Sequence, residues 1–94
     1  MGKAMLIQPT QSFEVFIKLD SSQYQCQMLS LSENLLELKG IHHIELLTPI
    51  EFRSSYFRGV GTIKDVIFDT FYYIFLIQIE SIHFQPGFLI NTEM

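Results

Sequence analysis

Two arginines, Arg53 and Arg58, are the side chains of this sequence with the clearest capacity to bind a ligand. They flank residues 54–57, just before a predicted hairpin. A guanidinium group presents a planar fork of N–H donors that fits a phosphate or a carboxylate. The pair therefore indicates either an anion site, to which Ser30 could contribute a hydroxyl, or two surface cations that balance acids such as Glu51.

The histidine pair His42-His43, with Glu45 nearby, comes nearest to a metal site in its residue types. A bound metal ion needs several ligands that converge on one point. Adjacent side chains of an extended chain point to opposite faces, so the two imidazoles do not converge. Because no cysteine lies close and His83 is distant in the sequence, we expect solvated or structural histidines and no metal.

The sequence offers no arrangement suited to nucleophilic or acid–base catalysis. Cys26 lies between two glutamines, without the cationic surroundings that lower a thiol pKa, and is better interpreted as a small buried hydrophobe. The carboxylates Asp65 and Asp69 are too generic to assign acid and base roles. The Gly-Val-Gly segment at 59–61 lacks the lysine and the helix of a phosphate-binding loop. We predict a protein that is not an enzyme and uses no cofactor.

The composition favours a folded domain that does not bind nucleic acid. Of the 94 residues, 48% are hydrophobic, far more than a disordered chain contains. The net charge is -4 and only six residues are Lys or Arg, whereas binding to DNA or RNA depends on many cations. An oligonucleotide-binding barrel that stacks bases on Tyr56, Tyr72 and Tyr73 is a weaker alternative, disfavoured by this acidic balance.

Targeting features predict a cytoplasmic protein without membrane insertion. A single cysteine cannot form an intrachain disulfide, which fits a reducing compartment. The N-terminal residues include only four consecutive apolar positions, too few for the core of a signal peptide. The longest apolar run covers residues 71–77, well short of the ~20 residues that a membrane helix needs.

Alternating apolar and polar residues predict an all-β protein. Such alternation is the period of a strand with one buried face. A loop or a short helical turn is expected at 41–47, and a connector at 54–58. We predict a single domain over residues 1–94, a small antiparallel β-barrel of six to seven strands with little or no helix, with its core at about 13–82 and flanking tails at 1–12 and 83–94. The predicted strands are 13–19, 24–31, 35–39, 49–53, 60–68 and 71–79, with Ile50 and Phe52 inward in the fourth.

Within the stretch 28–39, residues 30–34 form a polar corner between two predicted strands. Tyr24, Cys26 and Met28 share one parity, but Leu29 and Leu31 take the other, which requires a bulge near Met28. No glycine or proline marks the bend itself. We therefore expect Asn34, the residue type that best tolerates a left-handed conformation without being glycine, to turn the chain.

The predicted last hairpin, with its turn at 69–70, carries two further signals. Gly59 and Gly61 are expected where a barrel strand bends sharply. Residues 71–76 are apolar on both parities, so that both faces of the strand need cover. We expect a protein partner or a second copy to supply the outer cover, contacting Phe71, Tyr72, Ile74 and Leu76 and the apolar tail residues Phe88, Leu89 and Ile90.

The order of these segments resembles the PilZ domain family, small bacterial β-barrels. The family's corner is written Asp/Asn-x-Ser-x-x-Gly, and here Met28–Glu33 stands at those positions and continues into Leu35–Leu38. The Pro-initiated strand of the family matches residues 48–52, and its Gly-x-Val/Ile hairpin start matches residues 61–66. Residues 73–79 match the strand that closes the barrel, so that the resemblance covers about residues 13–82.

Departures from the family motif decide the function that the resemblance implies. PilZ domains that bind cyclic di-GMP use an Arg-x-x-x-Arg segment before the first strand, whereas this chain has no arginine before Arg53. Met28 replaces the acid or amide of the corner and Glu33 replaces its glycine, and only Ser30 matches. Losing several charge-assisted hydrogen bonds, each worth about 1.5–3 kcal/mol, should remove useful affinity.

The resemblance therefore implies an adaptor that works by protein–protein interaction in cyclic di-GMP signalling or in type IV pilus and motility control. Family members of this kind contact the pilus assembly ATPase and an EAL-type regulator, and others oligomerise. The alternative is a module that binds cyclic di-GMP or another anion through Arg53, Arg58 and Ser30.

Overall fold

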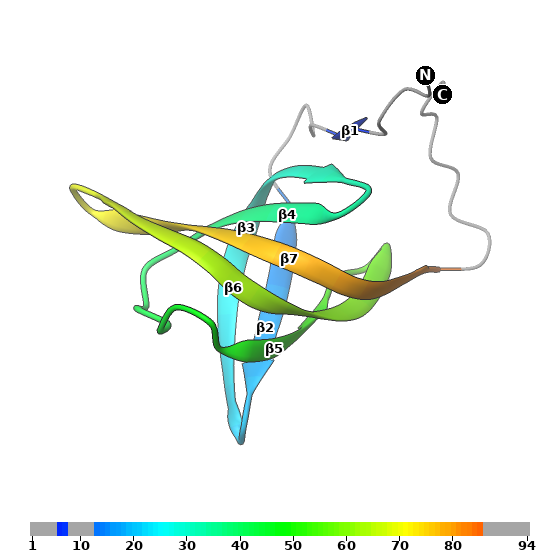
Figure 1. The fold of residues 1–94 in the computed structure, drawn as a ribbon, viewed down its shortest axis with the longest axis horizontal. Helices are drawn as coiled ribbons and strands as arrows, with labels where there is room; N and C mark the ends of the chain where they lie inside the picture. The colour runs from blue at the N-terminus through cyan, green and yellow to red at the C-terminus, as the bar shows by residue number, and fades with distance from the viewer. Residues whose placement is uncertain (1–5, 8–12, 86–94) are drawn as a thin grey trace.

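The computed structural model describes residues 6–7 and 13–85, which form seven antiparallel strands and no helix. Hydrogen bonding gives the strand order β1-β3-β2-β5-β6-β7-β4, and a further pairing of β3 with β4 closes the sheet on itself (Figure 1). Strands β2 to β7 thus form the small antiparallel barrel that the sequence predicts. The described residues contain no helix that is long and apolar enough to cross a membrane. The strands are β1 (Leu6–Ile7), β2 (Glu14–Leu19), β3 (Ser22–Ser32), β4 (Leu35–Gly40), β5 (Pro49–Arg53), β6 (Phe57–Asp69) and β7 (Tyr72–Phe84).

Inward-facing side chains fill the barrel because successive residues of a strand point to opposite faces. Val15 and Ile17 are buried on β2, and Ile50 and Phe52 are buried on β5, as the alternation predicts. Every buried side chain of the described residues is apolar, and each contributes about 1.5–3 kcal/mol. The core comprises Val15, Ile17, Cys26, Met28, Leu31, Leu36, Leu38, Ile44, Ile50, Phe52, Phe57, Ile63, Phe75 and Ile77.

A bulge in β3 confirms the predicted change of phase near Met28. Pairing with β4 joins Met28 to Leu38 and Ser30 to Glu37, so the register shifts between Met28 and Ser30. Met28 is buried before the shift and Leu31 is buried after it, three residues later. The additional residue keeps apolar side chains inward along both halves of this long strand.

The turn between β3 and β4 consists of Glu33 and Asn34, and its geometry differs from the prediction. Asn34 does not have a positive φ angle, so the expectation that it adopts the left-handed conformation was wrong. Positive φ angles among the described non-glycine residues occur at Asp20, Leu47 and Thr70.

Hydrogen bonds to neighbouring groups hold this turn without a left-handed residue. The Ser32 hydroxyl accepts a hydrogen bond from the Leu35 N–H at 3.2 Å, which supports the bend from inside the turn. From β7, the Ile79 N–H donates to the Asn34 carbonyl at 2.8 Å and the Gln78 side-chain amide donates to the same oxygen at 3.3 Å. A distant strand therefore supplies the stabilisation that the local sequence was expected to provide.

Close packing of β6 against its neighbours explains both glycines of that strand. A Cβ atom at Gly59 would lie 2.6 Å from Cζ of Phe52 and closer still to the carbonyl oxygen of Ser81. A Cβ atom at Gly61 would collide with the carbonyl oxygen of Gln78, next to a register shift in the β6–β7 pairing. Since backbone atoms cannot yield as side chains do, no larger residue fits either position.

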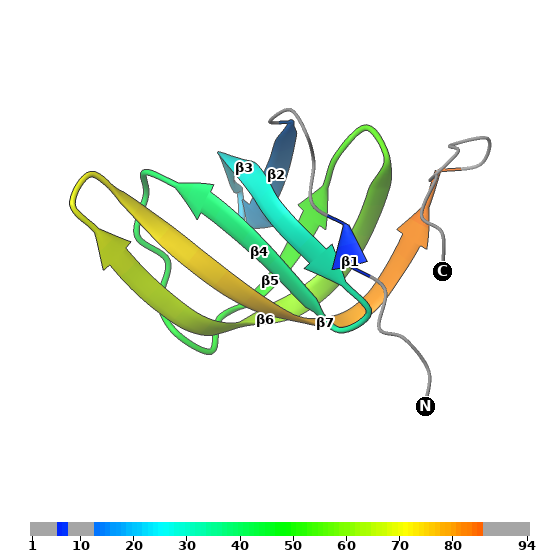
Figure 2. The ribbon, with the colours of Figure 1, turned by 90° about the horizontal axis from the view of Figure 1, so that it is seen from above.

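The β6–β7 hairpin is longer than the sequence predicts. Its strands have 13 residues each, and its turn is Thr70 and Phe71, one residue later than expected. The expected connector is also shorter, because the Ser54 hydroxyl accepts hydrogen bonds from the N–H groups of Tyr56 and Phe57 at 3.0 and 3.2 Å. This tight turn lets β6 begin at Phe57, and the far turn of the hairpin lies at one extreme of the molecule (Figure 2).

Residues 41–48 connect β4 to β5 as a loop, which resolves the ambiguity between loop and helical turn. Ile44 is buried in the core and anchors the loop. The Leu47 N–H donates to the Ile63 carbonyl at 2.7 Å, and the Ile63 N–H donates to the Thr48 carbonyl at 3.0 Å. The loop is therefore fixed beside the middle of β6.

Candidate functional site

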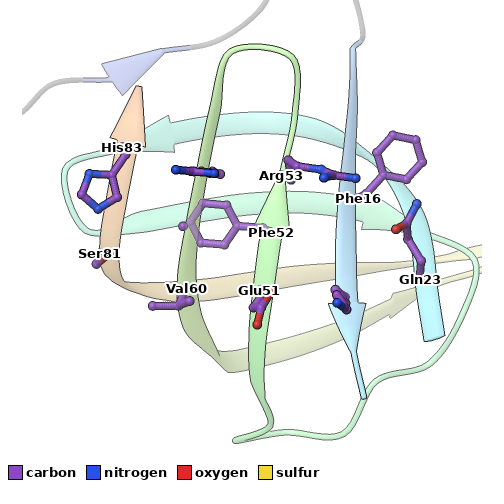
Figure 3. A pocket seen from close by; sticks show the side chains of 11 residues that line it. Phe16, Gln23, Glu51, Phe52, Arg53, Val60, Ser81 and His83 are labelled. Atoms are coloured by element: carbon purple, nitrogen blue, oxygen red, sulfur yellow. The ribbon is translucent and has the colours of Figure 1, made fainter. Parts of the chain in front are cut away.

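The structure brings Arg53 and Arg58 together on the outer face of the barrel. Arg53, at the end of β5, is the Cα partner of Arg58 on β6. The row continues from Arg53 to Phe16 on β2 and from Arg58 to His83 on β7. Cross-strand partners share one face, with Cβ atoms about 4.5–5.5 Å apart. Four side chains thus form one line across four strands, with Phe16 and His83 at its two ends (Figure 3).

A second outward row lies two residues further along the same strands. It joins Lys18 on β2 to Glu51 on β5, Val60 on β6 and Ser81 on β7. The two rows line an open hollow of about 390 Å³. We call it the arginine hollow, and its lining is completed by Gln23, Phe52 and Gly59.

The arginine hollow concentrates positive charge on a protein whose net charge is -4. Lys18, Arg53 and Arg58 are three of the six Lys and Arg residues in the chain, and Glu51 is the one carboxylate beside them. Within residues 13–85, none of these three cations lies within ion-pair distance of a carboxylate. Within the described residues their charges thus have no carboxylate partner, which favours an anion as their ligand.

Ser30, the third residue predicted for an anion site, lies in another part of the barrel. It is located at the bulge of β3, and its hydroxyl donates a hydrogen bond to Oε1 of Glu37 on β4 at 3.0 Å. It does not line the arginine hollow. The structure thus joins two of the three predicted ligand residues and separates the third.

Exposed apolar side chains gather at the other end of β6. Seven large hydrophobic residues of the described chain are exposed, and six of them come from the 41–48 loop and the region of the β6–β7 turn. Two perpendicular views place both segments on the same side of the molecule (Figures 1 and 2). We call this surface the apolar end, which comprises Ile41 (71% exposed), Leu46 (53%), Leu47 (70%), Ile67 (48%), Phe68 (61%) and Phe71 (82%).

Ring contacts and backbone strain give the apolar end a defined shape. Phe68 packs on Tyr73 with ring centroids 5.0 Å apart, and Tyr73 contacts His43 of the loop at 5.3 Å. Leu47 has a φ angle of 66°, a conformation that costs a branched residue about 1–3 kcal/mol. Its hydrogen bond to Ile63 holds that conformation while the side chain faces solvent. Strain of this kind is found preferentially at functional positions.

The outer face of β7 is only half-covered. Phe75 and Ile77 are buried inside the barrel, whereas the predicted interface residues Tyr72, Ile74 and Leu76 face outward and are half-buried. The ammonium of Lys39 lies 4.7 Å from the centroid of the Tyr72 ring. No second layer of the described chain covers this face, so its predicted partner stays a prediction. The other predicted interface residues, Phe88, Leu89 and Ile90, lie outside the described residues.

Asp69 ties the start of β7 to the end of β6. The two residues Asp69 and Tyr72 are Cα partners across the turn. A hydrogen bond to the Asp69 carboxylate and its negative charge raise the pKa of the Tyr72 hydroxyl, because both disfavour the phenolate. The Tyr72 hydroxyl is thus a polar contact within the hairpin.

The cysteine and histidines have structural surroundings. Cys26 is buried, and loss of solvent raises the pKa of its thiol to about 11, which keeps it protonated at neutral pH. His42 packs on Tyr24 at 5.1 Å, whereas His43 packs on Tyr73, so the two imidazoles diverge. In the part of the chain that the structure describes, no three metal-ligating side chains come together.

Sequence reasoning missed most residues of both surfaces. Phe16, Lys18 and His83 join the arginines only through the pairing of β2, β5, β6 and β7, which no local pattern reveals. The loop residues Leu46 and Leu47 carried a usable signal, since two adjacent leucines without strand alternation have no place in the core.

Neither a scan against models of protein families nor a search of curated proteins finds a match for this chain.

Proposed function

We propose that this protein is a degenerate PilZ-like domain that acts as an adaptor and binds a protein partner through the apolar end. The observation that carries the proposal is the gathering of six exposed apolar side chains on two neighbouring segments. Exposed apolar side chains are costly in water, and where they gather on a soluble protein they mark an interaction site. Aromatic residues such as Phe68 and Phe71 are typical anchors of protein interfaces.

The chemistry of the β3–β4 corner supports an adaptor rather than a receptor for cyclic di-GMP. Met28, at the position of the family's acid or amide, is buried in the barrel and offers no ligand group. Ser30 is already hydrogen-bonded to Glu37. Glu33, at the position of the family's glycine, is exposed and adds a negative charge that repels a phosphodiester. The corner thus retains its turn while lacking the groups that would hold the ligand.

The PilZ resemblance suggests where such an adaptor works. We propose a role in cyclic di-GMP signalling or in type IV pilus and motility control in the bacterial cytoplasm, with the pilus assembly ATPase or an EAL-type regulator as partner. The half-covered outer face of β7, with Ile74 and Leu76, borders the apolar end and would extend the contact. The alternative is that a second copy of the chain binds the same surface and forms a homodimer.

Binding measurements with a double variant test this proposal. We expect Phe68→Ser combined with Phe71→Ser to abolish capture of the ATPase or the regulator, because both rings are anchors of the contact. The control is Val60→Ser, which removes the one exposed large hydrophobic residue of the described chain that lies outside the apolar end. Equal capture by the double variant and the wild type would refute the proposal.

Size-exclusion chromatography with light scattering separates the two occupants. A dimer that the double variant dissociates would assign the apolar end to a second copy. A stable monomer that captures neither the ATPase nor the regulator would overturn the adaptor function.

The alternative function, binding of cyclic di-GMP, has one observation in its favour. Arg53 and Arg58 are cross-strand partners and line one hollow. Calorimetric titration with cyclic di-GMP decides between the two functions: micromolar binding that Arg53→Gln removes would replace the adaptor proposal. We expect no such binding, because Ser30 lies apart and the chain has no arginine pair before β2.

A further inference from the structure

We propose that the arginine hollow is a binding site for a terminal phosphate group, a phosphate monoester carried by a small ligand with a planar ring, such as a nucleoside monophosphate. This inference goes beyond the proposed adaptor function and does not depend on it. Arg58 and Val60 lie near the beginning of β6, whereas Ile67 and Phe68 of the apolar end lie near its end. The two surfaces can therefore be disabled separately.

The donor arrangement is the first argument. Arg53 and Arg58 stand as cross-strand partners on paired strands, so their guanidinium groups start from neighbouring Cβ atoms on one face. Lys18 reaches the same hollow from β2. Each guanidinium can donate two parallel hydrogen bonds to a phosphate, and the ammonium adds a third charge. Like charges placed this close repel one another, and a bound anion removes that repulsion.

The absence of internal partners is the second argument. Within the described residues these cations form no ion pair, although the chain holds ten acidic residues and only six basic ones. Glu51 lines the hollow as the partner of Lys18 across the β2–β5 pairing, but does not neutralise it. The residues that line the hollow thus carry a charge of +2, from three cations and one carboxylate, whereas the whole protein has a net charge of -4. This local positive charge on an acidic protein favours an anion in the hollow.

The charge and shape of the ligand follow from the lining. A terminal phosphate carries about -1.5 to -2 charges near pH 7 and three acceptor oxygens, enough to occupy two guanidinium forks and one ammonium. A bridging phosphodiester has one charge and only two free oxygens. The rings of Phe16 and His83 stand at the two ends of the arginine row and offer planar faces to a base or another ring (Figure 3). A hollow of about 390 Å³ is of the size that holds a small ligand.

Titration of the full chain with three related probes tests the ligand class. The probes are AMP, cyclic AMP and adenosine, which share a base and differ in having a monoester, a diester and no phosphate. At low ionic strength we expect AMP to bind with a Kd below about 1 mM, cyclic AMP about ten-fold more weakly, and adenosine not measurably. Added salt should weaken AMP binding, because the contacts are exposed to solvent.

Surface variants of the hollow test the site itself. Arg53→Gln and Arg58→Gln should each weaken AMP binding about ten-fold, the value of one charge-assisted pair. Glu51→Gln should strengthen it about two- to five-fold, because it removes the one carboxylate of the lining. The matched control is Lys64→Gln, the same loss of charge on β6 outside the hollow, and it should leave the affinity unchanged. All four residues are exposed, so circular dichroism should show the wild-type fold for every variant.

Three results would overturn the inference. One is no binding of AMP at millimolar concentration in low salt. Another is cyclic AMP bound as tightly as AMP, which would remove the preference for a terminal phosphate. The third is equal weakening by Lys64→Gln and Arg53→Gln, which would reduce the effect to non-specific charge. None of these results bears on capture of a protein partner at the apolar end, so the two proposals fail separately.

Discussion

Two of the barrel's hairpin turns, β3–β4 and β6–β7, differ in what surrounds them. The β3–β4 turn, at Glu33 and Asn34, is held by Ser32 and by two hydrogen bonds from β7, and it is followed by Leu36, which is fully buried. The β6–β7 turn lies at one extreme of the molecule, where Phe71 is 82% exposed (Figure 2). Both turns have two residues and connect consecutive antiparallel strands.

This difference separates a turn that serves the fold from the turn that we propose as part of an interaction surface. The β3–β4 turn is fixed by a third strand, and the Ser32 hydroxyl and the Asn34 carbonyl are used in internal hydrogen bonds. Among the described residues, no hydrogen bond joins the β6–β7 turn to a third strand, and the turn presents the Phe71 ring to solvent. Such an exposed ring gains free energy when a partner covers it. We therefore infer the proposed interaction surface from the location of apolar exposure and not from the corner motif of the PilZ resemblance.

The largest loss of stability is expected when a buried side chain beside the β3–β4 turn is removed. Leu36→Ala should lower the free energy of unfolding by about 2–5 kcal/mol, because it leaves a cavity in the core. Urea denaturation followed by circular dichroism measures this loss. A change below about 1 kcal/mol would mean that this region is not the packed part of the barrel.

Stability at alkaline pH provides a second test, at the buried residue Cys26 on β3. Burial raises the pKa of the Cys26 thiol from its usual 9.0 to about 11, so the folded protein holds this proton more tightly than the unfolded chain does. Its contribution to stability is complete below pH 9 and declines as the pH rises through 11. The loss should reach roughly 2–3 kcal/mol.

Comparison with Cys26→Ala isolates this contribution from other groups that titrate in alkali. Denaturation curves of both proteins between pH 8 and pH 11 should converge as the pH rises. Parallel stability profiles would show that the thiol does not lose solvent on folding.

A smaller effect is expected for the hydroxyl that supports the β3–β4 turn. Ser32→Ala removes the acceptor of the Leu35 N–H and should cost about 1 kcal/mol, the usual net value of such a hydrogen bond. Thermal unfolding measures the difference. Ser22→Ala, an exposed serine at the opposite end of β3, is the matched control and should be nearly neutral.

The smallest effect on stability is expected at the exposed turn. Phe71→Ser should change the free energy of unfolding by less than about 0.5 kcal/mol, since the ring is mostly in solvent already. Urea denaturation beside Leu36→Ala gives the direct contrast. Strong destabilisation by Phe71→Ser would show that the hairpin turn serves the fold and would weaken its assignment as an interaction surface.

The strands and their inward faces were predictable because alternation is a local property. Val15 and Ile17 on β2, and Ile50 and Phe52 on β5, are buried as their spacing indicates. The bulge near Met28 was also predictable, since a change of parity within one strand demands an additional residue. These features follow from neighbours along the chain.

The surfaces were less predictable because they depend on strands that are distant in sequence. Arg53 and Arg58 were identified from their residue type, but Phe16 and His83 became their neighbours only when β2 paired with β5 and β6 with β7. The left-handed conformation expected at Asn34 was wrong because Ile79, 45 positions later, supplies a hydrogen bond that no local pattern shows. Leu47 adopts the left-handed conformation instead, held by Ile63.

The sequence by itself determined an all-β chain, the position of its strands and the residues that face the core, because the period of two is written directly in the order of residues. Only the tertiary structure decided which outward residues share a surface. Closure of the barrel joins β3 to β4 and brings β2 beside β5, which aligns the cations of the arginine hollow and leaves the apolar end uncovered. Outward residues carry no periodic constraint, so their arrangement is fixed by strand pairing alone.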